Sequence, residues 1–390
     1  MLDQKIDFKD IAPYSDSQFH EKMAQLVKEP GFENAVKFVL PDVDYSEMAQ
    51  QLLSIHTRDE LQHKVMRPFL EMLAARTSDG ITCEGLDNVE LGKLSYTFIT
   101  NHRDIVLDAS FLNLCFLRNN LPSSQVAIGN NLLIYDWISD LVRLNKSFIV
   151  RRNLPISKSL EAAIELSAYI HHAVADENES VWIAQRQGRA KDSNDVTQES
   201  LVKMLAIAGE GDFIDHLKEI RLAPVTISYE YDPNDYLKAR EYLMRRLDPG
   251  FKKSQRDDLF SMETGLLQPK GHIHFAVSPC INDQLDLINR RQPKAVQVKE
   301  VCKIIDTCIH SRYMIYPVNY IAYDMLHDTD RFTDQYTPEQ KSAFEQRITS
   351  QLAKVDIPDL SGIDTAYMRQ MVLTMYANPL KNKLEALQTK

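Results

Sequence analysis

The chain has 390 residues, of which 44% are hydrophobic and 26% are charged, and its formal net charge at pH 7 is −10. These proportions are typical of a globular protein with a sizeable core, and the acidic balance argues against nucleic acid as a partner. No apolar run approaches the roughly 20 residues that span a bilayer, and the N-terminus has no signal-peptide pattern. The five cysteines are scattered, without a CxxC pair, which predicts a reducing, cytoplasmic setting with neither disulfides nor a zinc site.

Residues 1–85 are expected to form an N-terminal helical region. Apolar residues recur at spacings of three and four between Ser46 and Ala75, which is the period of a helix face. Pro30, Pro41 and Pro68 divide the region into several helices.

Short β-type runs then alternate with helical patterns over residues 86–284. The predicted strands are 96–100, 125–128, 147–150, 181–184, 223–229 and 272–277, and the predicted helices are 109–118, 131–144, 160–175, 198–207 and 235–247. This alternation predicts an α/β domain, a mixed and mostly parallel sheet flanked by helices.

Residues 285–390 return to helical patterning and are expected to pack on the α/β domain as a C-terminal extension. One helix is predicted to begin at Pro338, with Thr337 as its N-cap, and another to span 363–377. The polar stretch 381–390 is expected to be frayed. No repeat or low-complexity linker separates the three regions.

A polar turn containing Asn101, His102 and Asp104 follows the first predicted strand, and Asp108 stands where the next helix begins. Imidazole titrates near neutrality and a neighbouring carboxylate fixes its tautomer, so His102 is a candidate general base. Residues six apart lie on different faces of a helix, so Asp108 meets His102 only if the histidine lies in the turn. Asp104 is the alternative partner, and Thr100 or Asn101 is expected to assist the turn, since an asparagine side chain bonds its own backbone. The competing interpretation is a surface histidine beside a helix-capping aspartate.

Two later strands each end in basic residues. Arg151 and Arg152 follow the strand at 147–150, where a planar guanidinium suits bidentate recognition of phosphate. The alternative is two solvated arginines at an edge. The strand at 181–184 is followed by a cluster that consists of Arg186, Gly188, Arg189 and Lys191. Glycine permits a sharp turn or close approach to a ligand, so this cluster predicts an anion site.

His272 and His274 alternate along one predicted strand and therefore face the same way. A metal site needs at least one more ligand, and no carboxylate or histidine stands at a suggestive spacing in the sequence. We therefore predict no metal site.

Four of these stretches, in this order, resemble the glycerophospholipid acyltransferase family, which includes glycerol-3-phosphate and 1-acyl-glycerol-3-phosphate acyltransferases. Asn101-His102 looks like the family's histidine block, and residues 148–152 look like a second block that ends in arginine. Residues 188–191 are similar to its Gly-Arg-x-Arg block, and residues 224–230, which begin with Pro224, resemble the fourth. The resemblance covers roughly residues 95–280.

The chain departs from the family pattern at two places. Leu107 stands where the family has its aspartate, and Asp108 follows one residue later. The third block lacks the glutamate of many members, and Gln187 or Arg186 holds that place.

The resemblance implies an O-acyltransferase of phospholipid biosynthesis. It would move a fatty acyl group from acyl-CoA or acyl carrier protein to a hydroxyl of glycerol-3-phosphate or a lysophospholipid, without a metal or redox cofactor. His102 would be the general base, oriented by Asp108 or Asp104. Substrate phosphates would be bound by basic residues among Arg151, Arg152, Arg186, Arg189 and Lys191.

The resemblance also implies peripheral contact with the cytoplasmic face of a membrane. Residues 238–246 and Lys252-Lys253 offer a local basic region for it. Two alternatives remain open: a non-catalytic relative that binds lipid or acyl carrier protein, and the same chemistry on an aminoacyl lipid that bears a hydroxyl.

Overall fold

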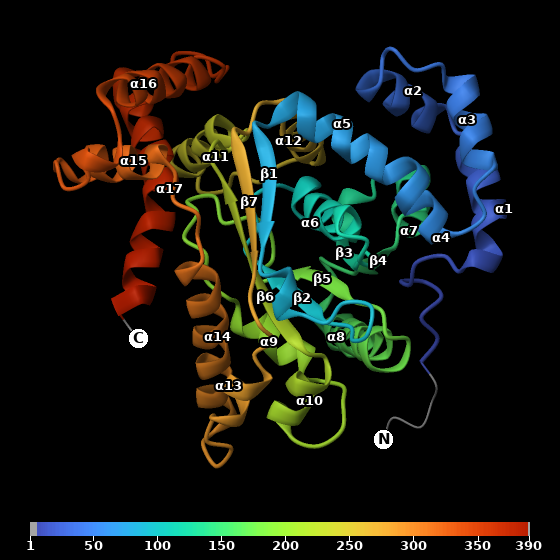
Figure 1. Ribbon diagram of the computed structural model, residues 1–390. Coiled ribbons are helices and arrows are strands. Elements are labelled where there is room, and N and C mark those ends of the chain that lie inside the picture. The colour runs from blue at the N-terminus through green and yellow to red at the C-terminus, as the bar shows by residue number, and fades with distance from the viewer. Residues whose placement is uncertain (1–5, 389–390) are drawn as a thin grey trace.

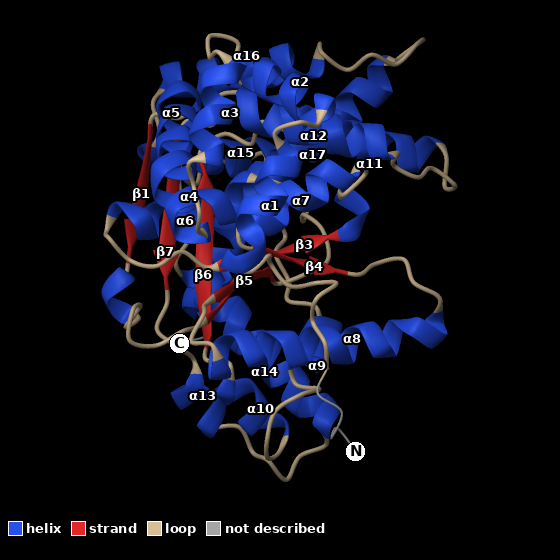
Figure 2. Ribbon diagram, turned by 90° about the vertical axis from the view of Figure 1, so that its right-hand side faces the viewer, coloured by secondary structure: helices blue, strands red, loops and turns tan. Residues whose placement is uncertain are grey.

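A seven-stranded sheet forms the centre of the protein, and the computed structural model describes residues 6–388 of the chain (Figure 1). The strands lie in the order β1-β7-β6-β2-β5-β3-β4. β6 and β7 are antiparallel, and the other neighbouring pairs are parallel. Helices flank the sheet (Figure 2). The predicted α/β class, with a mixed and mostly parallel sheet, is confirmed.

Six of the seven strands lie where the sequence predicts them. Their bounds are β2 (Thr97–Thr100), β3 (Gln125–Gly129), β4 (Ser147–Val150), β5 (Val181–Ala184), β6 (Leu222–Tyr229) and β7 (His272–Val277). The seventh, β1 (Gly80–Glu84), lies in the stretch that we expected to be helical. It is a five-residue edge strand with alternating exposure, and its partner β7 is almost two hundred residues away, so its local pattern is weak.

β6 is an internal strand of the sheet, although it contains Pro224 near its start. Proline removes a backbone donor and is usually found at sheet edges. Here Pro224 is in register with Ile99 of β2, whereas the ladder with β7 begins one residue later, at Val225. The proline therefore stands where β6 has only one ladder partner.

Within residues 6–79 the chain forms five α-helices, namely α1 (Asp16–Leu26), α2 (Pro30–Val39), α3 (Tyr45–Leu53), α4 (Arg58–Leu61) and α5 (Arg67–Thr77). Pro30 lies in the first turn of α2, where a missing N–H is tolerated, whereas Pro68 lies just after a π-helical segment (Gln62–Met66) that joins α4 to α5 without a break. The apolar faces of α1 to α4 share one core cluster with Leu144 of α7 (Asp136–Leu144), whereas Leu70 and Leu73 of α5 belong to the cluster that packs on β6 and β7. The two clusters tie the N-terminal helices to the α/β domain.

The remaining helices between β2 and β7 pack on the sheet or on the helices around it. They are α6 (Leu107–Arg118), α8 (Ile156–His171), α9 (Glu199–Leu205), α10 (Phe213–Glu219), α11 (Asp235–Leu247) and α12 (Gln255–Leu267). Phe111, Leu112 and Phe116 of α6 are fully buried against the strands. Figure 1 shows α6 beside the central strands, so the turn that precedes it lies at their carboxyl ends.

The helical part of the chain that follows β7 packs on α11 and on β6. It comprises α13 (Asn282–Asp286), α14 (Lys294–Ser311), α15 (Pro317–His327), α16 (Pro338–Leu352) and α17 (Gly362–Gln388). The predicted N-cap is confirmed, because Thr337 Oγ1 accepts a bond from Gln340 N. The expectation of a frayed end was wrong: α17 continues to Gln388 and buries Asn382 and Ala386, and the last two residues lie outside the described part.

Candidate active site

The turn between β2 and α6 brings His102 and Asp108 together. Because His102 precedes the helix, the residues between them form a loop, and His102 Nδ1 lies 2.8 Å from Asp108 Oδ2. The same oxygen accepts backbone N–H bonds from Arg103 at 2.6 Å and Asp104 at 3.0 Å. The extra residue relative to the family pattern is thus accommodated in the loop.

Asp104 does not contact His102 through its carboxylate. Its Oδ1 accepts the N–H groups of Val106 and Leu107, each at 2.9 Å, at the start of α6. Burial and the neighbouring charge of Asp108 raise the pKa of Asp104. Of the two partners that the sequence left open, the geometry brings Asp108 to the imidazole and gives Asp104 a helix-capping position.

The hydrogen-bond pattern sets the tautomer of His102. An ionised carboxylate only accepts hydrogen bonds, so Nδ1 carries the ring proton and donates a hydrogen bond to Asp108. Nε2 is then the basic nitrogen. The side chain is 13% exposed, lines a large cavity, and lies edge-on to the Trp182 ring at 5.7 Å. This arrangement holds one basic nitrogen at a partly enclosed site.

Asn101 holds the turn against the sheet. Its Nδ2 donates to Ile227 O at 2.9 Å and its Oδ1 accepts from Ile227 N at 2.8 Å, so it pairs with β6 as a strand residue would. The expectation that Asn101 bonds its own backbone was wrong. The Asn101 side chain bonds the backbone of Ile227, which is distant in the sequence, in place of its own backbone.

Arg103, which the sequence analysis did not single out, forms a buried ion pair directly beside His102. Its guanidinium makes two contacts with the Asp195 carboxylate, at 2.6 and 3.1 Å. The Tyr313 hydroxyl also donates to Asp195, and Lys238 Nζ donates to Arg103 O at 3.2 Å. Nothing in the local sequence pairs positions 103 and 195, so only the fold reveals this support.

The basic residues predicted at the ends of β4 and β5 do lie at one cavity with His102. Parallel strands present their carboxyl ends at the same edge of a sheet. The cavity lining therefore includes His102 together with Arg151, Arg152, Arg186, Gly188, Arg189 and Lys191.

Two of these five cations are neutralised by carboxylates. Arg151 contacts Glu165 at 3.1 Å and Asp10 at 3.5 Å. Lys191 bonds Glu241, while burial lowers its pKa. Neither cation is therefore free to carry a full positive charge to a ligand.

The other three cations have no carboxylate within ion-pair distance among residues 6–388. They are Arg152, Arg186 and Arg189. Arg186 Nε and Arg189 Nη1 are buried without a hydrogen-bond partner in the described structure, and burial lowers the pKa of Arg152. Buried charged donors without partners are unfavourable, so this wall of the cavity suits an anion.

Gly188 separates two of these arginines in the chain. Its φ of +71° lies in the left-handed region that favours glycine, and a Cβ there would meet nothing within 4 Å. The backbone conformation therefore favours glycine at this position, although there is space for a side chain.

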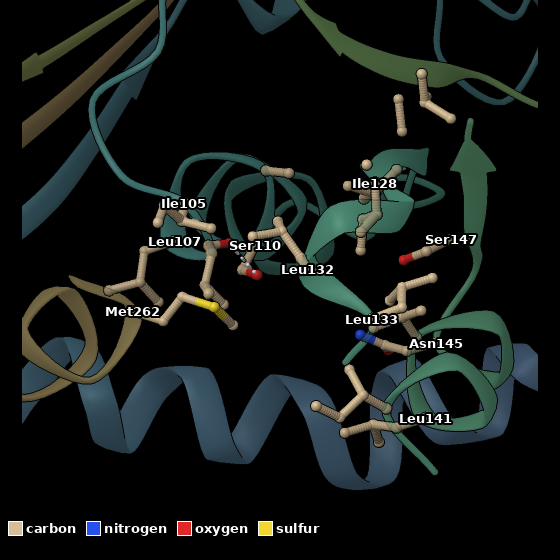
Figure 3. A pocket seen from close by; sticks show the side chains of 18 of the residues that line it. Ile105, Leu107, Ser110, Ile128, Leu132, Leu133, Leu141, Asn145, Ser147 and Met262 are labelled. Carbon is tan, nitrogen blue, oxygen red and sulfur yellow. Dashed lines mark hydrogen bonds between the residues drawn. The ribbon is translucent and has the colours of Figure 1, made fainter. Parts of the chain in front are cut away.

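The cavity has a volume of about 1280 Å³, above the range of about 300–1,000 Å³ for typical ligand pockets. Figure 3 shows Ile105, Leu107 and Met262 on one side and Leu132 and Leu133 on another. Further apolar lining comes from α2, α3, α5 and α8. The interior is thus mainly apolar, with the histidine and the arginines at its polar part.

The basic region expected to meet lipid is only partly exposed. Lys238 is buried and ion-paired with Asp232, and Glu241 is buried between Lys191 and Arg245. That part of the expectation was wrong, because the local sequence does not reveal which face of α11 packs against the molecule.

The chain was compared with known proteins. It matches no protein-family model and no curated protein sequence. Among solved structures, it is similar to the 1-acyl-sn-glycerophosphate (LPA) acyltransferase PlsC from Thermotoga maritima, with 14% identity and a TM-score of 0.34. The similarity covers 74% of this chain and 92% of that one. A likeness at this level establishes neither the family nor the activity of this chain.

Proposed function

We propose that the protein is an O-acyltransferase that moves a fatty acyl group from a thioester, acyl-CoA or acyl carrier protein, to a hydroxyl of a glycerophosphate or lysophospholipid. One observation carries the proposal: the His102–Asp108 pair opens onto a large apolar cavity that also contains three arginines without carboxylate partners. A base, an apolar channel and an anion site are the three elements that such a reaction requires. The resemblance of the four sequence blocks agrees with it.

His102 would act as the general base. Its Nε2 would take the proton of the acceptor hydroxyl as that oxygen attacks the thioester carbonyl carbon. The C–S bond then breaks, and the departing thiolate receives the same proton from Nε2. Asp108 would stabilise the charged imidazolium between these steps, and general base catalysis of this kind contributes about 10²–10⁴-fold.

Arg152, Arg186 and Arg189 would bind the phosphate of the acceptor or the phosphates of the donor. A phosphate would give Arg186 Nε and Arg189 Nη1 the charge-assisted bonds that they lack among residues 6–388. The apolar part of the cavity would hold the acyl chain, whose transfer out of water is favourable.

We also place the contact with the bilayer at the rim of the cavity. Val43 and Tyr135 line the cavity and yet are 40% and 57% exposed, so they lie at its mouth. Ile156 and Leu160 are 94% and 64% exposed on either side of Ser159, another lining residue. Exposed apolar side chains around the opening of an apolar cavity favour contact with a lipid surface. Within the described residues, no helix combines the length and apolarity needed to cross a membrane.

The proposal is tested with purified protein and radiolabelled acyl-CoA or acyl carrier protein. The acceptors are glycerol-3-phosphate, a 1-acyl-glycerol-3-phosphate and a hydroxyl-bearing aminoacyl lipid. We expect a labelled ester on one of the phosphate-bearing acceptors. Transfer only to the aminoacyl lipid would correct the acceptor. Binding of lipid or carrier protein without any transfer would contradict the proposal and favour a non-catalytic relative.

A further inference from the structure

We propose that Asp79, Glu230 and His272 form a binding site for a zinc-type divalent metal ion at the edge of the sheet. The three side chains come from three separate segments, and their ligand atoms all lie within 4.8 Å of one another. None of the three lines the cavity. The site is thus independent of the proposed acyl transfer.

The sheet itself brings these residues together. Asp79 immediately precedes β1, His272 is the first residue of β7, and the two strands are paired with Gly80 in register with His272. Glu230 immediately follows β6, the antiparallel neighbour of β7. Figure 1 shows β1 and β7 side by side. A metal ion at this point would join three strands of the sheet.

Backbone hydrogen bonds fix the segments that carry the three side chains. Asp79 N donates to Gly271 O at 2.9 Å, and Glu230 N donates to His272 O at 2.9 Å. Glu230 Oε2 accepts the N–H of His272 at 3.0 Å, which orients that carboxylate and leaves its other oxygen for a ligand. Metal ligands are commonly held by such secondary hydrogen bonds.

Close packing adds to the orientation of Glu230. Gly271 has a φ of +62°, and a Cβ built on it would lie only 2.6 Å from Glu230 Oε2. The carboxylate therefore lies directly over the glycine backbone.

The charges at this site are not compensated by the protein. Neither Asp79 nor Glu230 has an ion-pair partner among residues 6–388, although Lys270 is close in the sequence. Lys270 is buried and donates instead to Thr77 Oγ1 and Gln268 O, at 2.9 and 2.8 Å. Two carboxylates held close together without a cation favour the binding of one.

The donor set selects the class of metal. Zinc accepts imidazole nitrogen and carboxylate oxygen, often in a tetrahedral site with water as a further ligand. Tetrahedral ligands at about 2.1 Å from zinc lie roughly 3.4 Å apart, so ligand atoms that lie within 4.8 Å of one another need to close by at most about 1.4 Å. Magnesium prefers six oxygen ligands in octahedral geometry and suits this site less well.

Isothermal titration of the EDTA-stripped full-length protein with zinc sulfate tests the proposal. We expect one site with micromolar affinity, a rise in Tm on adding zinc, and weaker binding of magnesium. His272→Asn and Glu230→Gln should each weaken zinc binding by about tenfold or more and abolish the Tm rise. His63→Asn, which removes an exposed histidine elsewhere, should leave both unchanged.

The side chains at the site are exposed or half-buried, so circular dichroism of the metal-free variants should match that of the parent. The proposal is overturned if the parent binds no zinc. It is also overturned if His272→Asn and Glu230→Gln bind zinc as tightly as the parent, because the ion would then lie elsewhere. Neither result bears on acyl transfer.

Discussion

The turn around His102 and the arginine wall of the cavity differ in whether their charged side chains have partners of opposite charge. In the turn, His102 bonds Asp108 and Arg103 pairs with Asp195, both within buried surroundings. In the wall, Arg152, Arg186 and Arg189 have no carboxylate partner among the described residues. The charged groups of the turn therefore already have partners, which preorganises its geometry, although Asp104 Oδ2 and Asp108 Oδ1 have no hydrogen bond among the described residues; the wall gains an opposite charge only when an anion binds. Substitutions in the two regions should have different kinetic consequences.

The largest effect that separates the two regions is expected at Asp108. Asp108→Asn removes the charge that orients and stabilises His102, and we expect kcat to fall by about 10²–10⁴-fold. Asp104→Asn is the matched control, because an amide oxygen can still accept the two N–H groups at the start of α6. It should change kcat by only a few-fold. Comparable losses in both variants would contradict the assignment of Asp108.

The arginine wall should respond mainly in substrate binding. Arg152→Ala removes an unpaired guanidinium, and a lost hydrogen bond to a charged group costs about 1.5–3 kcal/mol, equivalent to about 10–150-fold in kcat/KM. Arg151→Ala is the matched control, because the guanidinium of Arg151 already pairs with Glu165. Steady-state kinetics with a phosphate-bearing acceptor check this. A larger defect in Arg151→Ala would reverse the roles.

The rigidity of the turn is testable through its packing against α12. A Cβ on Gly265 would lie 2.0 Å from Asp104 Oδ2. Gly265→Ala should lower the free energy of unfolding by about 1–3 kcal/mol, although alanine favours the helix. Urea denaturation measures this. In an Asp104→Ala background the loss should shrink, and an unchanged loss would place the strain elsewhere.

The sequence pattern predicted the strands of the sheet and the residues that line the cavity better than it predicted the contacts between them. Strands rich in apolar residues and the basic clusters that follow them are local features, so β4, β5 and Arg152 could be placed from sequence. β1 could not, because it is short, half-exposed and paired with a distant strand. The ion pair of Arg103 with Asp195 was equally invisible, because it depends on tertiary packing alone.

The burial of Lys238 could not be predicted from the sequence either. Lys238 reads as part of a basic surface, yet it is buried beside Asp232. Asp79 and Glu230 reach His272 only because β1, β6 and β7 are neighbours, which no spacing in the chain indicates.

The smallest expected effect concerns the apolar rim. The double variant Ile156→Ser/Leu160→Ser should reduce binding to phospholipid vesicles by about tenfold, because apolar side chains that enter the bilayer are lost. Leu287→Ser is the matched control, since Leu287 is 85% exposed near α13 and outside the cavity. Vesicle sedimentation measures both. If both variants bound vesicles equally well, the rim would not be part of the membrane contact.

His102 is proposed to move the proton in acyl transfer. The most direct measurement is the single-turnover rate of labelled acyl transfer by His102→Ala beside the parent protein, with circular dichroism to confirm folding. We expect the rate to fall by at least about 10²-fold, with the acyl donor still bound. A folded His102→Ala protein that transfers the acyl group at the parent rate would contradict this role of His102.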